Sequence, residues 1–224
     1  MKPLERLGEA RTPAGTTIAL YRHDGAYLIR ADGVELMSTR RHLSEDRLAL
    51  VACTPVRDVP GVRVLIGGLG LGFTLRAALR ELPETAEVVV AEFLEEVIAW
   101  NANPDYNISV EAMADPRVRI VHDDVVNVLR AHPGGFNAIM LDTDNGPDGM
   151  LMSENAPLYH MLGIESTINA LRPNGVIVYW SVGDDPRFLD ALQRSKLKIE
   201  TLKVRAHETS GPFHTLYVAT TKPR

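Results

Sequence analysis

The sequence predicts an α/β fold in which helices cover a mostly parallel β-sheet, with a small β-meander in front of it. Three observations support this prediction. Apolar, strand-like runs alternate with segments of helical periodicity, a glycine-rich turn at Gly67–Gly72 follows one such run, and several later runs end at a polar residue. This alternation is typical of a doubly wound parallel sheet whose strands are joined by right-handed crossovers.

The N-terminal part of the chain has a different residue pattern from the rest. Residues 16–38 contain short apolar runs separated by Asp-Gly turn signals, which predict a β-meander. Ser44 is expected to cap a helix that continues to about Cys53. We therefore predict two parts, an N-terminal meander and helix at 1–55 and a larger domain at 56–224.

The larger domain shows the alternation most clearly. Its expected strands cover 64–66, 88–91, 118–121, 138–141, 176–180, 197–205 and 215–220. Its expected helices cover 71–82, 94–101, 125–129, 158–171 and 184–194. Two stretches, 104–116 and 143–157, are predicted to be irregular.

The segment from Val64 to Glu92 has the order strand, glycine turn, helix, strand, acid. A glycine turn allows the backbone to approach a ligand closely, and the following helix directs free N–H groups and its positive end to the same place. Glu92, at the tip of the next strand, can accept hydrogen bonds from ribose hydroxyls. The order therefore predicts a site for a nucleoside-bearing cofactor.

The glycine spacing discriminates between cofactors. The dinucleotide fingerprint G-x-G-x-x-G would need a third glycine where the chain has Phe73. The glycines instead stand at Gly68, Gly70 and Gly72, in the form G-x-G-x-G. This form resembles the S-adenosylmethionine (AdoMet) motif of class I methyltransferases. A dinucleotide, or a turn that binds nothing, remains an alternative.

Composition excludes several other classes of function. The chain has 224 residues, 45% of them hydrophobic, and a net charge of −5, so no basic field attracts nucleic acid or an anionic membrane. Its single cysteine, Cys53, excludes an internal disulfide and suits a cytoplasmic location. No apolar run is long enough for a membrane span, and no closed histidine spacing predicts a metal.

The glycine segment also carries a family resemblance. Val64–Phe73, followed by Thr74–Arg76, is similar to the V-L-I-I-G-G-G-D-G-G and x-L-R motif of the spermidine synthase-like branch of class I AdoMet-dependent transferases. The resemblance extends from about Asp32 to Tyr179 and includes the meander. It implies a Rossmann-like, doubly wound fold and, as in those enzymes, a possible homodimer.

The resemblance also implies the site residues. Asp124 would face the adenine amino group, while Asp142 begins a loop similar to D-S-S-D-P-x-G-P and is the candidate base. Tyr159 is the second catalytic candidate. The implied cofactor-binding residues are Gly68, Gly70, Leu71, Gly72, Glu92, Asp123, Asp124 and Asp142.

Three departures affect the expected substrate. Leu71 replaces the aspartate that resembles a clamp for the amine of decarboxylated AdoMet, and Asn145 replaces the second aspartate of the loop. A Tyr-His-Glu triplet for the polyamine falls near Leu43, Ser44 and Glu45, so that only its acid is kept. We therefore expect methyl transfer from AdoMet to a small-molecule acceptor. Aminopropyl transfer from decarboxylated AdoMet to a polyamine, and AdoMet binding without turnover, are the alternatives.

Overall fold

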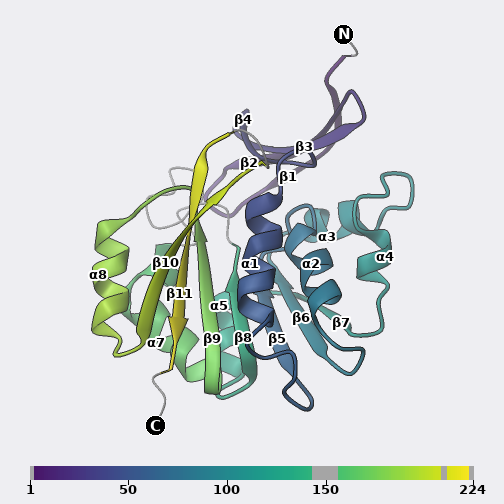
Figure 1. Ribbon diagram of the computed structural model, residues 1–224. Coiled ribbons are helices and arrows are strands. Elements are labelled where there is room, and N and C mark those ends of the chain that lie inside the picture. The colour runs from purple at the N-terminus through teal and green to yellow at the C-terminus, as the bar shows by residue number, and fades with distance from the viewer. Residues whose placement is uncertain (1–2, 143–155, 208–210, 222–224) are drawn as a thin grey trace.

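The computed structural model describes residues 3–142, 156–207 and 211–221, and shows two sheets (Figure 1). Four antiparallel strands form one sheet in the order β1-β2-β3-β4, and seven strands form the other in the order β10-β11-β9-β8-β5-β6-β7. Strands β5 to β9 run parallel to their neighbours in this group, whereas β10 and β11 are antiparallel. The predicted α/β class with an N-terminal meander is therefore confirmed.

The N-terminal sheet contains one strand more than the sequence predicts. Its strands are β1 Glu5–Arg11, β2 Thr17–His23, β3 Ala26–Ala31 and β4 Val34–Ser38. Strand β1 was not predicted, because its residues are mostly polar and exposed and show no apolar alternation. It is held by antiparallel backbone pairing with β2, which a residue pattern does not reveal.

The seven-stranded sheet follows the predicted order. Its strands are β5 Arg63–Gly67, β6 Glu87–Glu92, β7 Val118–His122, β8 Phe136–Leu141, β9 Leu171–Ser181, β10 Lys198–Arg205 and β11 Phe213–Thr220. Every residue of β8 is buried, as expected for a central strand whose two faces are both covered by helices.

Helices cover both faces of this sheet. They are α1 Leu43–Cys53, α2 Phe73–Glu81, α3 Glu95–Ala102, α4 Val110–Met113, α5 Val125–Ala131, α6 Ala156–Tyr159, α7 Met161–Ala170 and α8 Pro186–Arg194. In Figure 1, α1 and α2 lie in front of the sheet, with α5 and α7 behind it. Val64 and Ile66 pack into the core on the first side and Leu65 into the core on the second, because neighbouring strand residues point to opposite faces.

Three local predictions need correction. Ser44 does not cap α1; His42 occupies that position, and the buried Ser44 side chain bonds to other side chains instead. The helix predicted over 158–171 is two helices that meet at His160. The stretch predicted to be irregular at 104–116 contains the short helix α4. Of the predicted loop at 143–157, residues 143–155 lie outside the described residues.

The N-terminal sheet packs against the larger domain through an aromatic contact. Gly8 lies against the Trp100 indole, where an added Cβ would be 2.4 Å from Trp100 Nε1. Beside it, the Tyr106 hydroxyl donates to the Leu7 carbonyl over 3.4 Å. Leu48 of α1 packs in the same core as the larger sheet. The proposed division at residue 55 stays a prediction.

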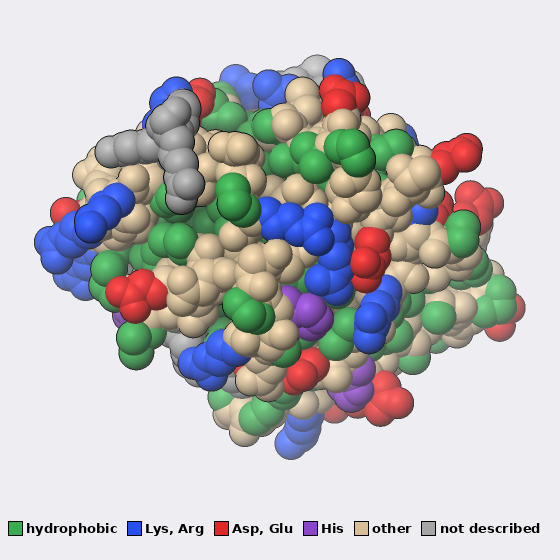
Figure 2. All heavy atoms as spheres, turned by 90° about the horizontal axis from the view of Figure 1, so that it is seen from below, with side chains coloured by type: hydrophobic (Ala, Val, Ile, Leu, Met, Phe, Trp, Pro, Cys, Tyr) green, Lys and Arg blue, Asp and Glu red, His purple; other side chains and the backbone are tan. Residues whose placement is uncertain are grey.

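The opposite end of the molecule shows no large surface of one charge. In Figure 2, which views the molecule from below, basic and acidic side chains lie next to one another between apolar groups. None of the helices in the described part of the chain is long and apolar enough to cross a membrane.

The contact at Gly8 yields a first prediction. Gly8→Val should lower the free energy of unfolding by about 1–3 kcal/mol, since the branched side chain must displace the Trp100 ring. Urea denaturation followed by tryptophan fluorescence measures this. Gly183→Val is the matched control, because a Cβ there meets nothing within 4 Å. Equal stability of the two variants would contradict the assigned contact.

Candidate functional site

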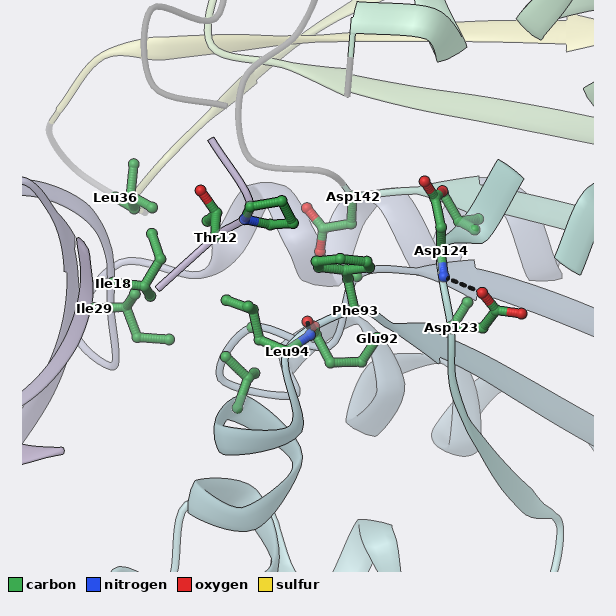
Figure 3. A pocket seen from close by; sticks show the side chains of 16 residues that line it. Thr12, Ile18, Ile29, Leu36, Glu92, Phe93, Leu94, Asp123, Asp124 and Asp142 are labelled. Atoms are coloured by element: carbon green, nitrogen blue, oxygen red, sulfur yellow. Dashed lines mark hydrogen bonds between the residues drawn. The ribbon is translucent and has the colours of Figure 1, made fainter. Parts of the chain in front are cut away.

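A pocket of about 230 Å³ opens where the carboxyl ends of β5, β6 and β8 meet the N-terminal sheet (Figure 3). Ligands of open α/β sheets bind at this edge. The residues that line it are Thr12, Pro13, Ile18, Ile29, Leu36, Gly68, Gly70, Ala91, Glu92, Phe93, Leu94, Val97, Asp123, Asp124, Val125 and Asp142. The pocket thus contains six of the eight predicted cofactor-binding residues.

The glycine turn forms one wall of this pocket. Gly68, Gly70 and Gly72 all have positive φ, at 91°, 51° and 72°. A Cβ at Gly70 would lie 2.7 Å from Met37 Cε, and one at Gly72 would lie 2.1 Å from Ser109 Oγ. Both the conformation and the close packing therefore require glycine.

Glu92 connects the turn to the next helix. Its carboxylate is buried and accepts the backbone N–H of Leu69 over 2.9 Å and that of Leu94 over 2.8 Å. Burial raises the pKa of Glu92, and these backbone donors oppose the rise. Each carboxylate oxygen has a further lone pair, so the group can still accept a hydrogen bond from a ligand in the pocket.

Two aspartates stand at another end of the pocket, next to α5. Asp124 caps α5 by accepting the Val126 N–H over 2.8 Å, and Asp123 accepts the Asp124 N–H over 2.7 Å (Figure 3). Both line the pocket, and so does Phe93, whose side chain is 44% exposed. An exposed aromatic ring between Glu92 and these aspartates offers a flat surface against which a base could stack.

A pair of carboxyl groups lies at the end of β8 and in α1. Asp142 accepts the Thr74 hydroxyl over 2.5 Å, and its backbone N–H donates to the Gly67 carbonyl. Removal from solvent raises the pKa of Asp142 to about 6. Burial, assisted by the charge of Asp142, raises the pKa of Glu45 to about 8. No lysine or arginine among the described residues forms an ion pair with either group.

The structure places three predicted residues away from the pocket lining. Leu71, only 2% exposed, packs in the core beside α2. Tyr159 packs in the second core with its ring 5.0 Å from that of Phe188 and 6.1 Å from that of Tyr179. Their roles in binding and catalysis stay predictions. Gly72 lies at the start of α2 rather than in the lining, and Asn145 is outside the described residues.

Sequence reasoning missed two features of this site. The first is an apolar wall from the N-terminal sheet, made by Ile18, Ile29 and Leu36 (Figure 3). The second is His214, whose Nδ1 lies 2.9 Å from Ser44 Oγ, next to Glu45. The family resemblance indicated Glu45 but not His214. In the described part of the chain, no three His, Cys, Asp or Glu side chains are placed to hold a metal ion.

Comparisons with known proteins agree with this geometry. No family model matches the chain. A curated polyamine aminopropyltransferase from Leptospira biflexa is 29% identical over 163 residues, which cover 68% of this chain and 53% of that protein. A polyamine aminopropyltransferase from Thermococcus onnurineus is 34% identical over 94 residues, or 41% of this chain and 33% of that protein. This chain therefore spans about half the length of the first relative, and less of the second.

Solved structures share the fold over nearly the whole chain. A spermidine synthase in complex with the transition-state analogue AdoDATO has a TM-score of 0.75 at 18% identity, and the Thermotoga maritima spermidine synthase has 0.76 at 17%. Each match covers 97% of this chain and 73% of the other. The fold is spermidine synthase-like, which confirms the resemblance found in the sequence.

The contacts of Glu92 generate the second prediction. Glu92→Gln should weaken adenosine binding about tenfold and lower the free energy of unfolding by about 1–3 kcal/mol, because the amide presents N–H groups to the Leu69 or Leu94 donors. Calorimetric titration and urea denaturation measure the two effects. Glu96→Gln, on the exposed side of α3, is the control and should change neither. Unchanged adenosine affinity in Glu92→Gln would remove Glu92 from the ligand site.

The buried acid of α1 generates the third prediction. The folded protein binds the Glu45 proton more tightly than the unfolded chain does, because the pKa of this carboxyl rises from 4.5 to about 8 on folding. The free energy of unfolding should therefore decrease as the pH rises through this range. In Glu45→Gln the decrease between about pH 6 and pH 8, where Asp142 is largely ionised, should be smaller.

Denaturation midpoints measured across this pH range test the third prediction. Glu96→Gln again serves as the control and should keep the wild-type pH dependence, since its side chain lies on the exposed surface of α3. If Glu45→Gln has the same pH dependence as the wild type, then Glu45 does not exchange its proton in this range.

Proposed function

We propose that this protein transfers an aminopropyl group from decarboxylated AdoMet to an amine acceptor. The observation that carries the proposal is the pair of carboxyl groups, Asp142 and Glu45, which lacks a lysine or arginine partner in the described part of the chain. The similar curated proteins are polyamine aminopropyltransferases, and they support this reading over the methyl transfer expected from the sequence.

The carboxyl pair suits a cationic acceptor. Burial disfavours ionisation and raises the pKa of both carboxyl groups, and the charge of Asp142 raises the pKa of Glu45 further. An ammonium group bound between them would favour the ionised form of each and would replace the missing counter-charge. An uncharged acceptor would gain nothing from this arrangement.

The same pair of carboxyl groups also supplies the base for the proposed reaction. When bound, the donor supplies a carbon attached to a positively charged sulfur, which leaves as a neutral thioether. An acceptor amine must lose a proton before its lone pair can attack, and Asp142 would take that proton. The new carbon–nitrogen bond forms as the carbon–sulfur bond breaks and its electron pair stays on sulfur. Thr74, bonded to Asp142 Oδ2, holds the carboxylate in place.

The nucleoside end of the donor would occupy the pocket described above. The glycine turn and Glu92 would hold the ribose, and Phe93 with the Asp123–Asp124 pair would surround the base. Oriented binding of donor and acceptor would supply most of the rate, since the leaving group needs no protonation.

Methyl transfer from AdoMet is the second candidate. It is favoured by Leu71, which stands where the resembling enzymes have an aspartate that clamps the donor amine. Leu71 is buried among apolar residues, and the pocket wall formed by Ile18, Ile29 and Leu36 is apolar too. Neither supplies a partner for an ammonium group.

A product assay tests the proposal and gives the fourth prediction. The protein is incubated with 1,4-diaminobutane and either decarboxylated AdoMet or AdoMet, and products are identified by mass spectrometry. Aminopropylated diamine should form with the first donor only. Methylated amine with AdoMet alone would favour the second candidate, and binding of the donors without product would indicate a non-catalytic protein.

A variant at Asp142 links that activity to the site. Asp142→Asn should lower turnover by about 10²–10⁴-fold, the usual contribution of a positioned general base, because an amide cannot take the proton. The decrease should become smaller as the pH rises and the free amine becomes more abundant. Asp190→Asn, on the exposed surface of α8 and paired with Arg194, is the control and should keep wild-type turnover. Unchanged turnover in Asp142→Asn would remove Asp142 from the reaction.

A further inference from the structure

A line of hydrogen bonds leads from Glu45 to strand β11 of the seven-stranded sheet. The Ser44 hydroxyl donates to Glu45 Oε2, and Ser44 Oγ in turn lies 2.9 Å from His214 Nδ1. Ser44 and Glu45 belong to the first turn of α1, whereas His214 lies on β11, 170 residues further along the chain. Ser44 is completely buried, so water does not compete for its hydroxyl.

The proton count fixes the role of each group. An ionised Glu45 carboxylate can only accept hydrogen bonds, so in that state the single proton of the Ser44 hydroxyl is donated to Glu45. The contact between Ser44 Oγ and His214 must then use a proton on Nδ1, which makes His214 the donor and Ser44 the acceptor. The Trp180 indole packs edge-on against the imidazole, 4.6 Å between ring centroids, and limits rotation of the ring.

The His214 imidazole carries no charge at neutral pH. Burial, together with the charge of Arg41, lowers the pKa of His214 to about 4, so the imidazole is uncharged. The charged groups that act on Glu45 are Asp142 and Asp46. Hydrogen bonding from Ser44 opposes them, since a donor to a carboxylate favours its ionised form.

We propose that His214 is a positioning residue that acts through Ser44 to orient the Glu45 carboxyl group and, given the proposed function, to tune binding of the cationic acceptor. His214 touches neither the pocket lining nor Asp142 in the contacts described. Its effect is indirect: it fixes the Ser44 hydroxyl, and the hydroxyl fixes the carboxylate. Without the imidazole the hydroxyl can rotate, and Glu45 loses a directed donor.

Two readouts test this inference, one of which needs no ligand. The first is the titration of Glu45 in the free protein, followed by NMR of ¹³C-labelled glutamate side chains and assigned with Glu45→Gln. The second is calorimetric binding of 1,4-diaminobutane. His214→Phe should move the Glu45 midpoint to higher pH and weaken diamine binding roughly tenfold, as expected for one lost hydrogen bond to a charged group.

Matched variants separate positioning from general damage. His214→Asn keeps an N–H close to the position of Nδ1 and should restore both readouts to near the wild-type values. His132→Asn, at the end of α5 and bonded to the Val128 carbonyl, is the control and should change neither. In Ser44→Ala, His214→Phe should have no further effect on either readout, because the imidazole acts through the hydroxyl.

Each outcome decides a different question. A folded His214→Phe protein with the wild-type Glu45 midpoint overturns the inference, as does a full effect of His214→Phe in the Ser44→Ala background. If the midpoint moves as expected but the wild type binds no diamine, the positioning role stands and the proposed amine acceptor is wrong.

Discussion

The site depends on one buried carboxylate. Glu92 ends strand β6 and accepts one N–H from the glycine turn and one from the start of α3. A buried carboxylate without donors would be strongly destabilising, so both backbone segments must stay within reach of it. The turn, the strand tip and the helix therefore form one rigid unit. These segments form part of the pocket wall, and α5, β8 and the N-terminal sheet form the rest.

Asp142 and Glu45, at the other end of the site, are hydrogen-bonded differently from Glu92. Glu92 is satisfied by the protein itself, whereas Asp142 and Glu45 have a single hydroxyl donor each, Thr74 and Ser44. Burial raises the pKa of both groups, and the charge of Asp142 raises that of Glu45 further. Groups whose ionisation is disfavoured in this way are common where a ligand or a proton is handled. Glu92 thus stabilises the fold, whereas Asp142 and Glu45 are the two carboxyl groups that we propose to bind a ligand.

Features that depend on residues close together in the sequence could be predicted, whereas features that depend on contacts between distant segments were missed. The order strand, turn, helix, strand and acid at 64–92 could be recognised because each step has a local pattern. Strand β1 could not, since backbone pairing with β2 holds it in place. The assignment of Ser44 as a helix cap failed for the same reason: its partners, Glu45 and His214, are side chains, and His214 arrives from β11.

This difference explains why the resemblance is uneven along the chain. In the proposed nucleoside end, the glycine turn and Glu92 come from one continuous segment, and the positive φ of Gly70 and Gly72 favours glycine there, so this part has a recognisable motif. The proposed acceptor end combines residues of α1, β8 and β11, which meet only in the folded state. The imidazole of His214 on β11, for example, lies beside Ser44 of α1. The fold and the proposed nucleoside site can therefore be predicted from sequence motifs, whereas the acceptor has to be inferred from the charges and contacts of the folded protein.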